Sequence, residues 1–138
     1  MSKTLVDAIT EIQRLVATVD GIRVAPTYPP DQMNQFPFAI CYPDSTAITK
    51  EGAGAIRGLH TIALEIHIPN KDKARNIATL IPIGAAVYRL LFQDTNATLA
   101  STVDTIIAIN YDFGPLGYES VDTIGWRFGI DIKLREVL

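Results

Sequence analysis

Histidine is the residue type in this chain best suited to proton transfer or metal binding near neutral pH. His60 and His67 are its two histidines, seven positions apart, in a segment that alternates like a β-strand. On a strand this spacing places the two rings on opposite faces and about 23 Å apart, at ~3.3 Å per residue. They cannot bind one metal ion together, and we interpret both as structural or surface residues.

The single cysteine, Cys41, lies between Ile40 and Tyr42 in an apolar segment. A nucleophilic cysteine needs an exposed, electropositive setting or a helix N-terminus, and this segment offers neither. We interpret Cys41 as a small buried hydrophobic residue. One cysteine also excludes an internal disulfide and any multi-cysteine metal site.

The glycine-rich segment 52–58 (GAGAIRG) is a second candidate for chemistry. Its spacing matches neither the dinucleotide-binding nor the P-loop pattern, and no Lys-Ser or Lys-Thr pair follows it. We expect a flexible loop and not a phosphate site.

Carboxylates gather in the last third of the chain, and carboxylate pairs can do acid–base work. They are Asp104, Asp112, Glu119, Asp122 and Asp131. No base–nucleophile pair and no D-x-D metal motif accompanies them. We therefore expect a solvated acidic surface, with no catalytic, cofactor-binding or metal-binding residues and no enzymatic activity.

Composition favours one packed domain spanning residues 1–138, with 48% hydrophobic and 20% charged residues. The formal net charge is −3 and the sequence pI is about 5.2, which argues against a general nucleic-acid binder. No signal peptide is visible. No apolar run approaches the ~18 residues that span a bilayer. We expect a protein made in a reducing cytoplasm, without membrane contact.

Two segments have helical periodicity. In the first, Leu5, Ile9, Ile12, Val16 and Val19 form one apolar stripe. Thr4 and Asp7 predict an N-terminal capping box, and Asp20-Gly21 predicts the end of this helix. The second helix is predicted from Lys71 to Leu91, capped by Asn70, with a kink or break at Pro82.

Strands are predicted between and after the helices. The ranges are a short strand at 22–25, then 36–42 closed by Pro43-Asp44, 59–68, 103–111 and 123–134. Four prolines predict an ordered surface loop over 26–37. The order α-β-β-α-β-β predicts an α+β fold: a mostly antiparallel sheet of four to five strands with two helices packed on one face.

The last strand alternates strictly over Thr123–Leu134. Its length is about 40 Å at ~3.4 Å per residue, whereas a domain of this size has a diameter of roughly 35–40 Å. The strand must cross the whole domain, bend at Gly125 or Gly129, or project beyond it. A long sheet that neighbouring molecules could share is therefore expected.

Two connections are candidates for contacts with partners. Segment 46–58 is predicted to be either a long hairpin arm or a mobile loop, and 112–120 a glycine- and proline-containing loop. The candidate interface residues of the first are Lys50, Glu51, Gly52, Gly54, Ile56 and Arg57. Those of the second are Phe113, Pro115, Leu116 and Tyr118.

This layout resembles the tail terminator (tail completion) proteins of long-tailed bacteriophages. The segments that carry the resemblance are TLVDAITEIQRLV (4–16), FPFAICYPD (36–44), LHTIALEIHIP (59–69) and GWRFGIDIKLRE (125–136). The resemblance implies a structural virion protein with no cofactor. Such a protein forms a ring, usually a hexamer, in the tail or neck of the virion after assembly in the host cytoplasm.

The resemblance also implies partners: further copies of the chain, the tail tube protein that the ring caps, and the head–tail connector protein. DNA would pass through the ring without specific binding, which suits an acidic chain because phosphates are repelled. A connector, a stopper or a tail-tube-like ring subunit remains an alternative. A small enzyme or ligand-binding module remains another, with a pocket between the second helix and the sheet lined by Tyr88, His67 and Glu65.

Overall fold

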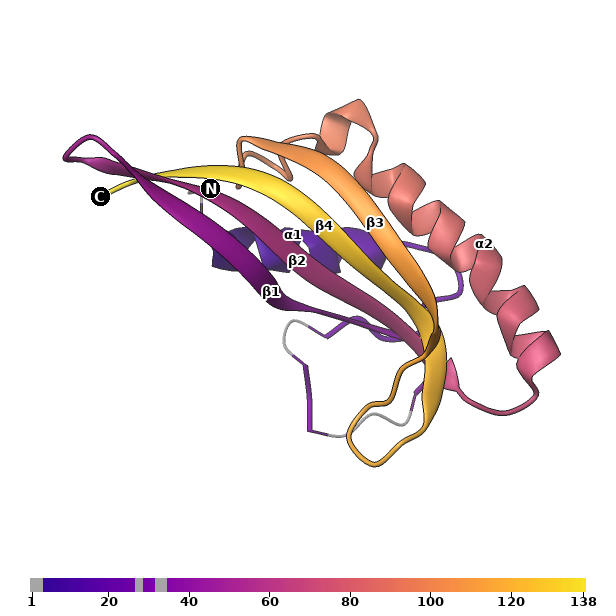
Figure 1. The fold of residues 1–138 in the computed structure, drawn as a ribbon. Helices are drawn as coiled ribbons and strands as arrows, with labels where there is room; N and C mark the ends of the chain where they lie inside the picture. Colours follow the sequence, from indigo (N-terminus) through magenta and orange to yellow (C-terminus); the bar gives the residue numbers. More distant parts are fainter. Residues whose placement is uncertain (1–3, 27–28, 32–34) are drawn as a thin grey trace.

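The computed structural model describes residues 4–26, 29–31 and 35–138. Its elements follow the predicted order α-β-β-α-β-β, with a short 3₁₀-helix (η1) before the third strand (Figure 1). They are α1 (Leu5–Val16), β1 (Phe38–Glu51), β2 (Ala55–Pro69), α2 (Lys73–Leu91), η1 (Asp94–Asn96), β3 (Thr105–Pro115) and β4 (Thr123–Val137).

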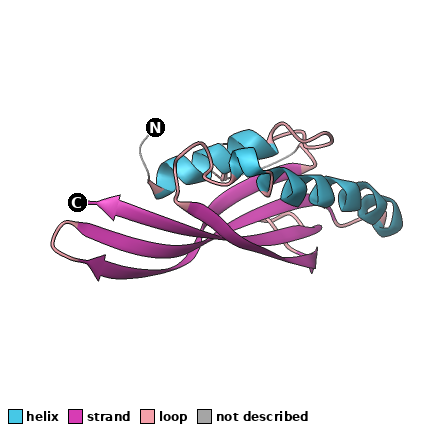
Figure 2. Cartoon of the chain, turned by 90° about the horizontal axis from the view of Figure 1, so that it is seen from above, coloured by secondary structure: helices cyan, strands magenta, loops and turns pink. Residues whose placement is uncertain are grey.

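The four strands form one antiparallel sheet in the order β1-β2-β4-β3. Both helices lie on the same face of this sheet (Figure 2). The predicted α+β class, the strand number and the placement of the helices are confirmed. Because β2 and β4 are central, β1 and β3 are the two edge strands.

The core lies between the helices and the sheet. Alternate residues of β4 face the helices, and all six are at most 7% exposed: Ile124, Trp126, Phe128, Ile130, Ile132 and Leu134. The indole Nε1–H of Trp126 donates to the Leu80 carbonyl of α2 at 2.8 Å. Burying an aliphatic side chain of this size stabilises the fold by about 1.5–3 kcal/mol, so the alternation specifies which face of β4 is inside.

The long strand β4 projects beyond the helices. It pairs with β2 along its whole length, from Thr123 opposite Pro69 to Val137 opposite Ala55. The end that contains Val137 extends past the first turn of α1 (Figure 1). Of the three arrangements expected for a strand of this length, projection is the one observed.

Four predicted strand limits are wrong by three residues or more. β2 begins at Ala55 and not at Leu59, and β4 ends at Val137 and not at Leu134. β1 continues through Pro43 to Glu51, with a register shift between Pro43 and Ser45, and β3 continues past Tyr111 to Pro115. Proline cannot donate to a ladder, but on an edge strand its nitrogen can face outward at no cost. Segment 46–58 is therefore the hairpin arm and not a mobile loop.

The start of α2 also differs from the prediction. Asn70 does not cap the helix, because its backbone N–H and its Nδ2 both donate to Asp122. Asp72 occupies the N-cap position at φ 49°, without a side-chain capping bond. Pro82 lies on the exposed side and the helix is not split there.

At the start of the chain, Thr4 Oγ1 accepts the Asp7 N–H at 3.1 Å, which confirms this half of the predicted capping box. α1 ends at Val16, four residues before the expected stop at Asp20, and turns follow up to Gly21. The strand expected at 22–25 is reduced to one bridge, between Val24 and Phe38. The loop expected at 26–37 includes residues 27–28 and 32–34, which lie outside the described residues.

Candidate assembly surfaces

Residues 45–60 of β1 and β2, together with residues 132–138, form a three-stranded extension of the sheet, which we call the arm (Figure 1). The register runs from Thr46–His60–Ile132 near the body to Glu51–Ala55–Val137 near the tip. Ladder hydrogen bonds therefore hold the arm as a rigid continuation of the sheet.

The six candidate interface residues of the first segment all lie at the tip of the arm. Lys50 and Glu51 end β1, Gly52 and Gly54 lie in the turn, and Ile56 and Arg57 are near the start of β2. Gly52 has φ +65°, a conformation that glycine adopts without steric cost. The turn is fastened to β4's end by the Leu138 N–H, which donates to the Gly54 carbonyl at 2.8 Å.

Glu51 organises the charges of the tip. Its carboxylate lies 3.1 Å from Arg57 and 3.2 Å from Arg135, so one anion bridges two cations on adjacent strands. Each such exposed pair contributes only about 0.2–1 kcal/mol. The main consequence is electrostatic, because the network leaves an excess positive charge on the arm.

Large apolar side chains are exposed on both faces of the arm. Ile48 on the helix-facing side is 54% exposed, while Leu59 and Val137 on the other side are 50% and 76% exposed. A single exposed apolar residue is ordinary, but a group on one projecting element marks an interaction surface. The arm thus has the composition of a contact site.

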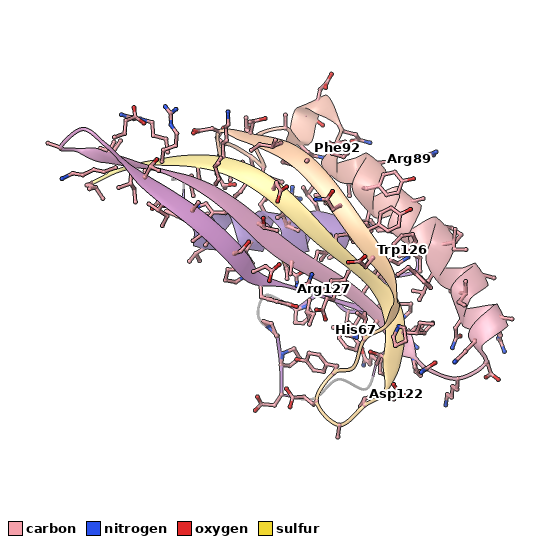
Figure 3. All side chains as sticks on the ribbon, viewed as in Figure 1. His67, Arg89, Phe92, Asp122, Trp126 and Arg127 are labelled. Atoms are coloured by element: carbon pink, nitrogen blue, oxygen red, sulfur yellow. The ribbon has the colours of Figure 1, made fainter. Side chains whose placement is uncertain are left out.

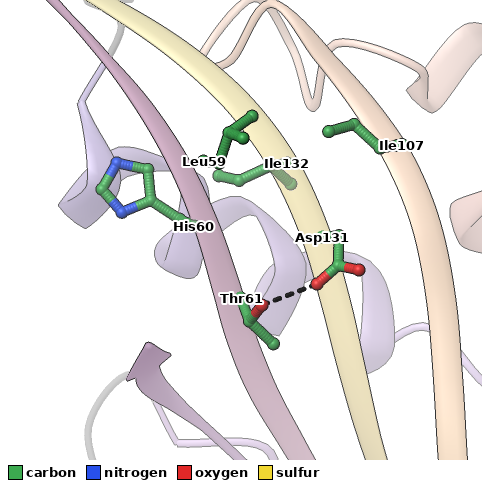
Figure 4. A pocket seen from close by; sticks show the side chains of 6 residues that line it. All are labelled: Leu59, His60, Thr61, Ile107, Asp131 and Ile132. Carbon is green, nitrogen blue, oxygen red and sulfur yellow. Dashed lines mark hydrogen bonds between the residues drawn. The ribbon is translucent and has the colours of Figure 1, made fainter. Parts of the chain in front are cut away.

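Two hollows border the base of the arm. One, of about 410 Å³, separates the start of α1 from the inner side of the arm; its lining includes Leu5, Pro43, Ile48, His60 and Glu136. The other, of about 240 Å³, has Leu59 and Ile107 on its walls (Figure 4). In this second hollow the Thr61 hydroxyl donates to Asp131 at 2.6 Å. The first hollow is mostly apolar and suits apolar side chains of a partner, whereas the second has a mixed lining that includes His60, Thr61 and Asp131.

The second candidate segment is not one continuous loop. Phe113 and Pro115 belong to β3, and Leu116 and Tyr118 lie in the connection to β4. Phe113 packs on Trp126 with ring centroids 5.0 Å apart. Tyr118 is 8% exposed, packs edge-on against Phe38 and donates its hydroxyl to the Pro30 carbonyl. Its ring therefore fastens this connection to the subunit's own sheet.

A polar chain that the sequence did not predict crosses the face of the sheet without helices. His67 Nε2 lies 2.7 Å from Glu65 Oε1, and His67 Nδ1 lies 2.6 Å from Thr123 Oγ1. The hydroxyl of Tyr42 donates to the other Glu65 oxygen. Figure 3 shows His67 and Arg127 in the half of the sheet away from the arm.

The order of donors in this chain follows from chemistry. A carboxylate only accepts, so His67 Nε2 donates to Glu65, and in a neutral ring Nδ1 then accepts the Thr123 O–H. Thr123 Oγ1 in turn accepts the Gly117 N–H at 2.9 Å.

Hydroxyl, imidazole and carboxylate resemble a nucleophile relay. However, Thr123 and His67 are each 0% exposed, and the Phe38 ring stacks on His67 at 4.7 Å. We interpret the chain as a structural network.

Glu65 is the charged centre of this network. Burial alone would raise the pKa of its carboxyl, but hydrogen bonds from His67 and Tyr42 and the charge of Arg127 together lower it. Burial and the bond to Glu65 raise the pKa of Tyr42 to about 12. Arg127 lies 3.7 Å from Glu65 and 3.2 Å from Asp44. The network thus keeps the Glu65 carboxylate ionised at a partly buried position of β2.

Two other residues considered for chemistry, Cys41 and His60, are enclosed. Cys41 is 2% exposed and burial raises its pKa to about 12, as expected for a buried hydrophobic thiol. His60 is 5% exposed and its Nδ1 lies 2.7 Å from the Thr46 hydroxyl. Among the described residues, no group of three or more His, Cys, Asp or Glu side chains is placed to hold a metal ion.

The pocket suggested for a ligand-binding module is not formed. Trp126 faces α2 and is paired with Ile66, which therefore lies on the same face of the sheet. Glu65 and His67, on either side of Ile66 in β2, point to the opposite face. Tyr88 of α2 packs on the helix side. The three proposed lining residues are therefore separated by the sheet itself.

No protein-family model matches the chain, and no curated protein sequence matches it. Within the described residues, neither helix has the length and apolar content needed to cross a membrane.

Proposed function

We propose that this protein is a structural ring subunit of a long-tailed phage, which caps the tail tube and joins it to the head connector. The observation that carries the proposal is the arm. It is a rigid, three-stranded projection with exposed apolar side chains that no element of its own subunit covers. A projecting sheet of this kind is suited to bind a neighbouring chain by strand addition or by apolar burial.

The chemistry of the body supports the same proposal. The hydroxyl–imidazole–carboxylate chain is enclosed, with its donors and acceptors paired. The net charge of −3 suits a ring through which DNA passes without adhering. Assembly then depends on surfaces, and the residues that matter are those of the arm and of the sheet edges.

The test is a shortened arm. Removing Lys50, Glu51, Ala55 and Ile56 takes two facing pairs out of the hairpin and keeps the three-residue turn, which would then join Thr49 to Arg57. Each strand loses two residues, so the side chains that remain keep their faces. We expect the variant to fold, because of the four removed residues only Ala55 is buried.

Wild-type protein and the shortened variant are incubated with isolated tail tubes and imaged by electron microscopy. We expect rings on tube ends with the wild type and few or none with the variant. The double change Lys71→Glu and Arg75→Glu, at exposed positions just before α2 and in its first turn, is a control that leaves the arm intact. Wild-type protein that ignores tubes would reject the proposed function, and capping by the shortened variant would reject the role of the arm.

A further inference from the structure

The charges of this chain are unevenly distributed between the arm and the rest of the molecule. The arm has four basic side chains, Lys50, Arg57, Lys133 and Arg135, and two acidic ones, Glu51 and Glu136, for a formal charge of +2. Because the whole chain carries −3, the rest carries −5. The arm is thus a positive projection on a negative body, and its excess positive charge comes from Arg57 of β2 and from Lys133 and Arg135 of β4.

The β3 edge of the sheet is acidic. Between Arg89 and Arg127 there is no lysine, arginine or histidine, and there are five carboxylates: Asp94, Asp104, Asp112, Glu119 and Asp122. This segment contains β3 and the connections on both sides of it. Ile107 and Tyr111 of β3 are 47% and 57% exposed. The β3 edge therefore has the charge sign opposite to the arm and a comparable apolar content.

Both edges also have free backbone groups. In the described residues, no backbone hydrogen bond reaches the outer edge of β1 over 45–51, or that of β3 over 108–115. The two free stretches are of nearly equal length, seven and eight residues. Unpaired edges of this kind are templates for pairing with another chain.

Strand directions make the two edges compatible. The four strands alternate in direction, so β1 and β3 run in opposite senses. When a second copy is placed beside the first by a simple rotation, its β3 runs antiparallel to β1 of the first. The antiparallel sheet then continues across the contact with its usual hydrogen bonding.

We infer that the arm of one subunit binds the acidic β3 edge of the next subunit. This inference rests on the proposed function and names the contact that closes the ring. The alternative contacts, arm with arm or β3 with β3, bring like charges together and are disfavoured. A contact between two different surfaces of one chain is heterologous, and repeated rotation turns such contacts into a closed ring.

Complementary charge reversal tests this contact. The variant Lys50→Glu with Lys133→Glu changes the arm from +2 to −2, and the variant Asp94→Lys with Asp112→Lys and Glu119→Lys changes segment 90–126 from −5 to +1. All five positions are exposed, so both variants should fold as the wild type does. The double change Lys71→Glu and Arg75→Glu serves as the control with the same change in net charge as the arm variant.

Self-association is measured by light scattering and sedimentation up to the highest soluble concentration, and by electron microscopy of tube ends. We expect each reversed variant alone to associate roughly tenfold or more weakly than the wild type. Mixing the two variants should restore rings of alternating subunits, because every contact again pairs opposite charges. The control should assemble as the wild type does, and added salt should weaken wild-type association by screening.

The outcomes separate this inference from the proposed function. If both reversed variants form rings and cap tubes, the ring stands and the arm-to-edge contact is wrong. If assembly follows the charges but the rings ignore tubes, the contact stands and the tail role fails. If mixing restores only dimers, the interface is isologous and the inference is rejected. A wild-type protein that stays monomeric, alone and with tubes, rejects both.

Discussion

Thr123, His67 and Glu65 illustrate how burial decides what a set of residues does. In an open cleft, a hydroxyl, an imidazole and a carboxylate in this order would be a candidate for nucleophilic catalysis. Here the hydroxyl also accepts the Gly117 N–H, and Phe38 covers the ring. The same hydrogen bonds therefore serve to join β2, β4 and the connection before β4. Removing one member would leave a buried partner unsatisfied, at a cost of about 1–3 kcal/mol.

The lowered pKa of Glu65 makes this network sensitive to acid. Since the folded-state pKa lies below the ordinary value of 4.5, the contribution of Glu65 is complete above that value and is lost as the pH falls through the folded-state pKa. We expect the difference in unfolding free energy between wild type and Glu65→Gln to be constant near neutral pH and to shrink below about pH 4.5.

Urea denaturation followed by circular dichroism at several pH values measures this difference. Asp20→Asn removes an exposed carboxylate and controls for the general loss of negative charge. The same difference for this control should stay close to zero throughout. A difference for Glu65→Gln that does not change with pH would contradict the stabilising role of the Glu65 anion.

At the scale of elements, the attachment of α2 to the sheet depends on close approach. A Cβ atom at Gly84 would lie 2.2 Å from Cε2 of Trp126, whose indole also donates to Leu80. In a free helix, Gly→Ala would stabilise by about 1 kcal/mol. Overpacking against the indole costs about 1–3 kcal/mol and strains its hydrogen bond. The packing cost should therefore outweigh the gain in helix propensity.

We expect Gly84→Ala to lower the free energy of unfolding by up to roughly 2 kcal/mol, as the net of these two effects. Urea denaturation followed by circular dichroism gives the value, and the fluorescence of Trp126, the only tryptophan, reports its altered surroundings. Gly54→Ala is the matched control, because nothing lies within 4 Å of a Cβ there. A variant more stable than the wild type would show that α2 can move away from the sheet freely.

The elements also show which parts of the structure the sequence contains. Alternation identified the buried face of β4, since each member of the pattern is buried. Prolines 43 and 115 misled the prediction because the sequence does not say which strands are at the edge, where proline is tolerated. The network at His67 was missed for a related reason. Thr123 is 56 positions away, and only the β2–β4 register brings the two together.

On the scale of the whole molecule, the chain has an acidic body and a basic arm at opposite ends of one sheet. Like charge disfavours contacts between two bodies, while the arm provides a local attraction. The core and the arm are stabilised by different interactions. The helices cover the body, whereas the arm gains most of its stability from strand pairing and, if assembled, from its neighbour.

This separation predicts that stability depends on concentration. Association stabilises a folded subunit by mass action, by about 2.7 kcal/mol at one hundred times the dissociation constant. In a domain of this size, 1 kcal/mol shifts Tm by roughly 2–8 °C. Wild-type Tm should therefore rise by several degrees across a hundredfold range of protein concentration above the dissociation constant.

The variant with the shortened arm should unfold at one temperature throughout, close to that of dilute wild type, because its helices and body strands are intact. Thermal unfolding by circular dichroism and scanning fluorimetry covers this range. A wild-type Tm that is independent of concentration would mean that the arm does not stabilise its own subunit through a neighbour.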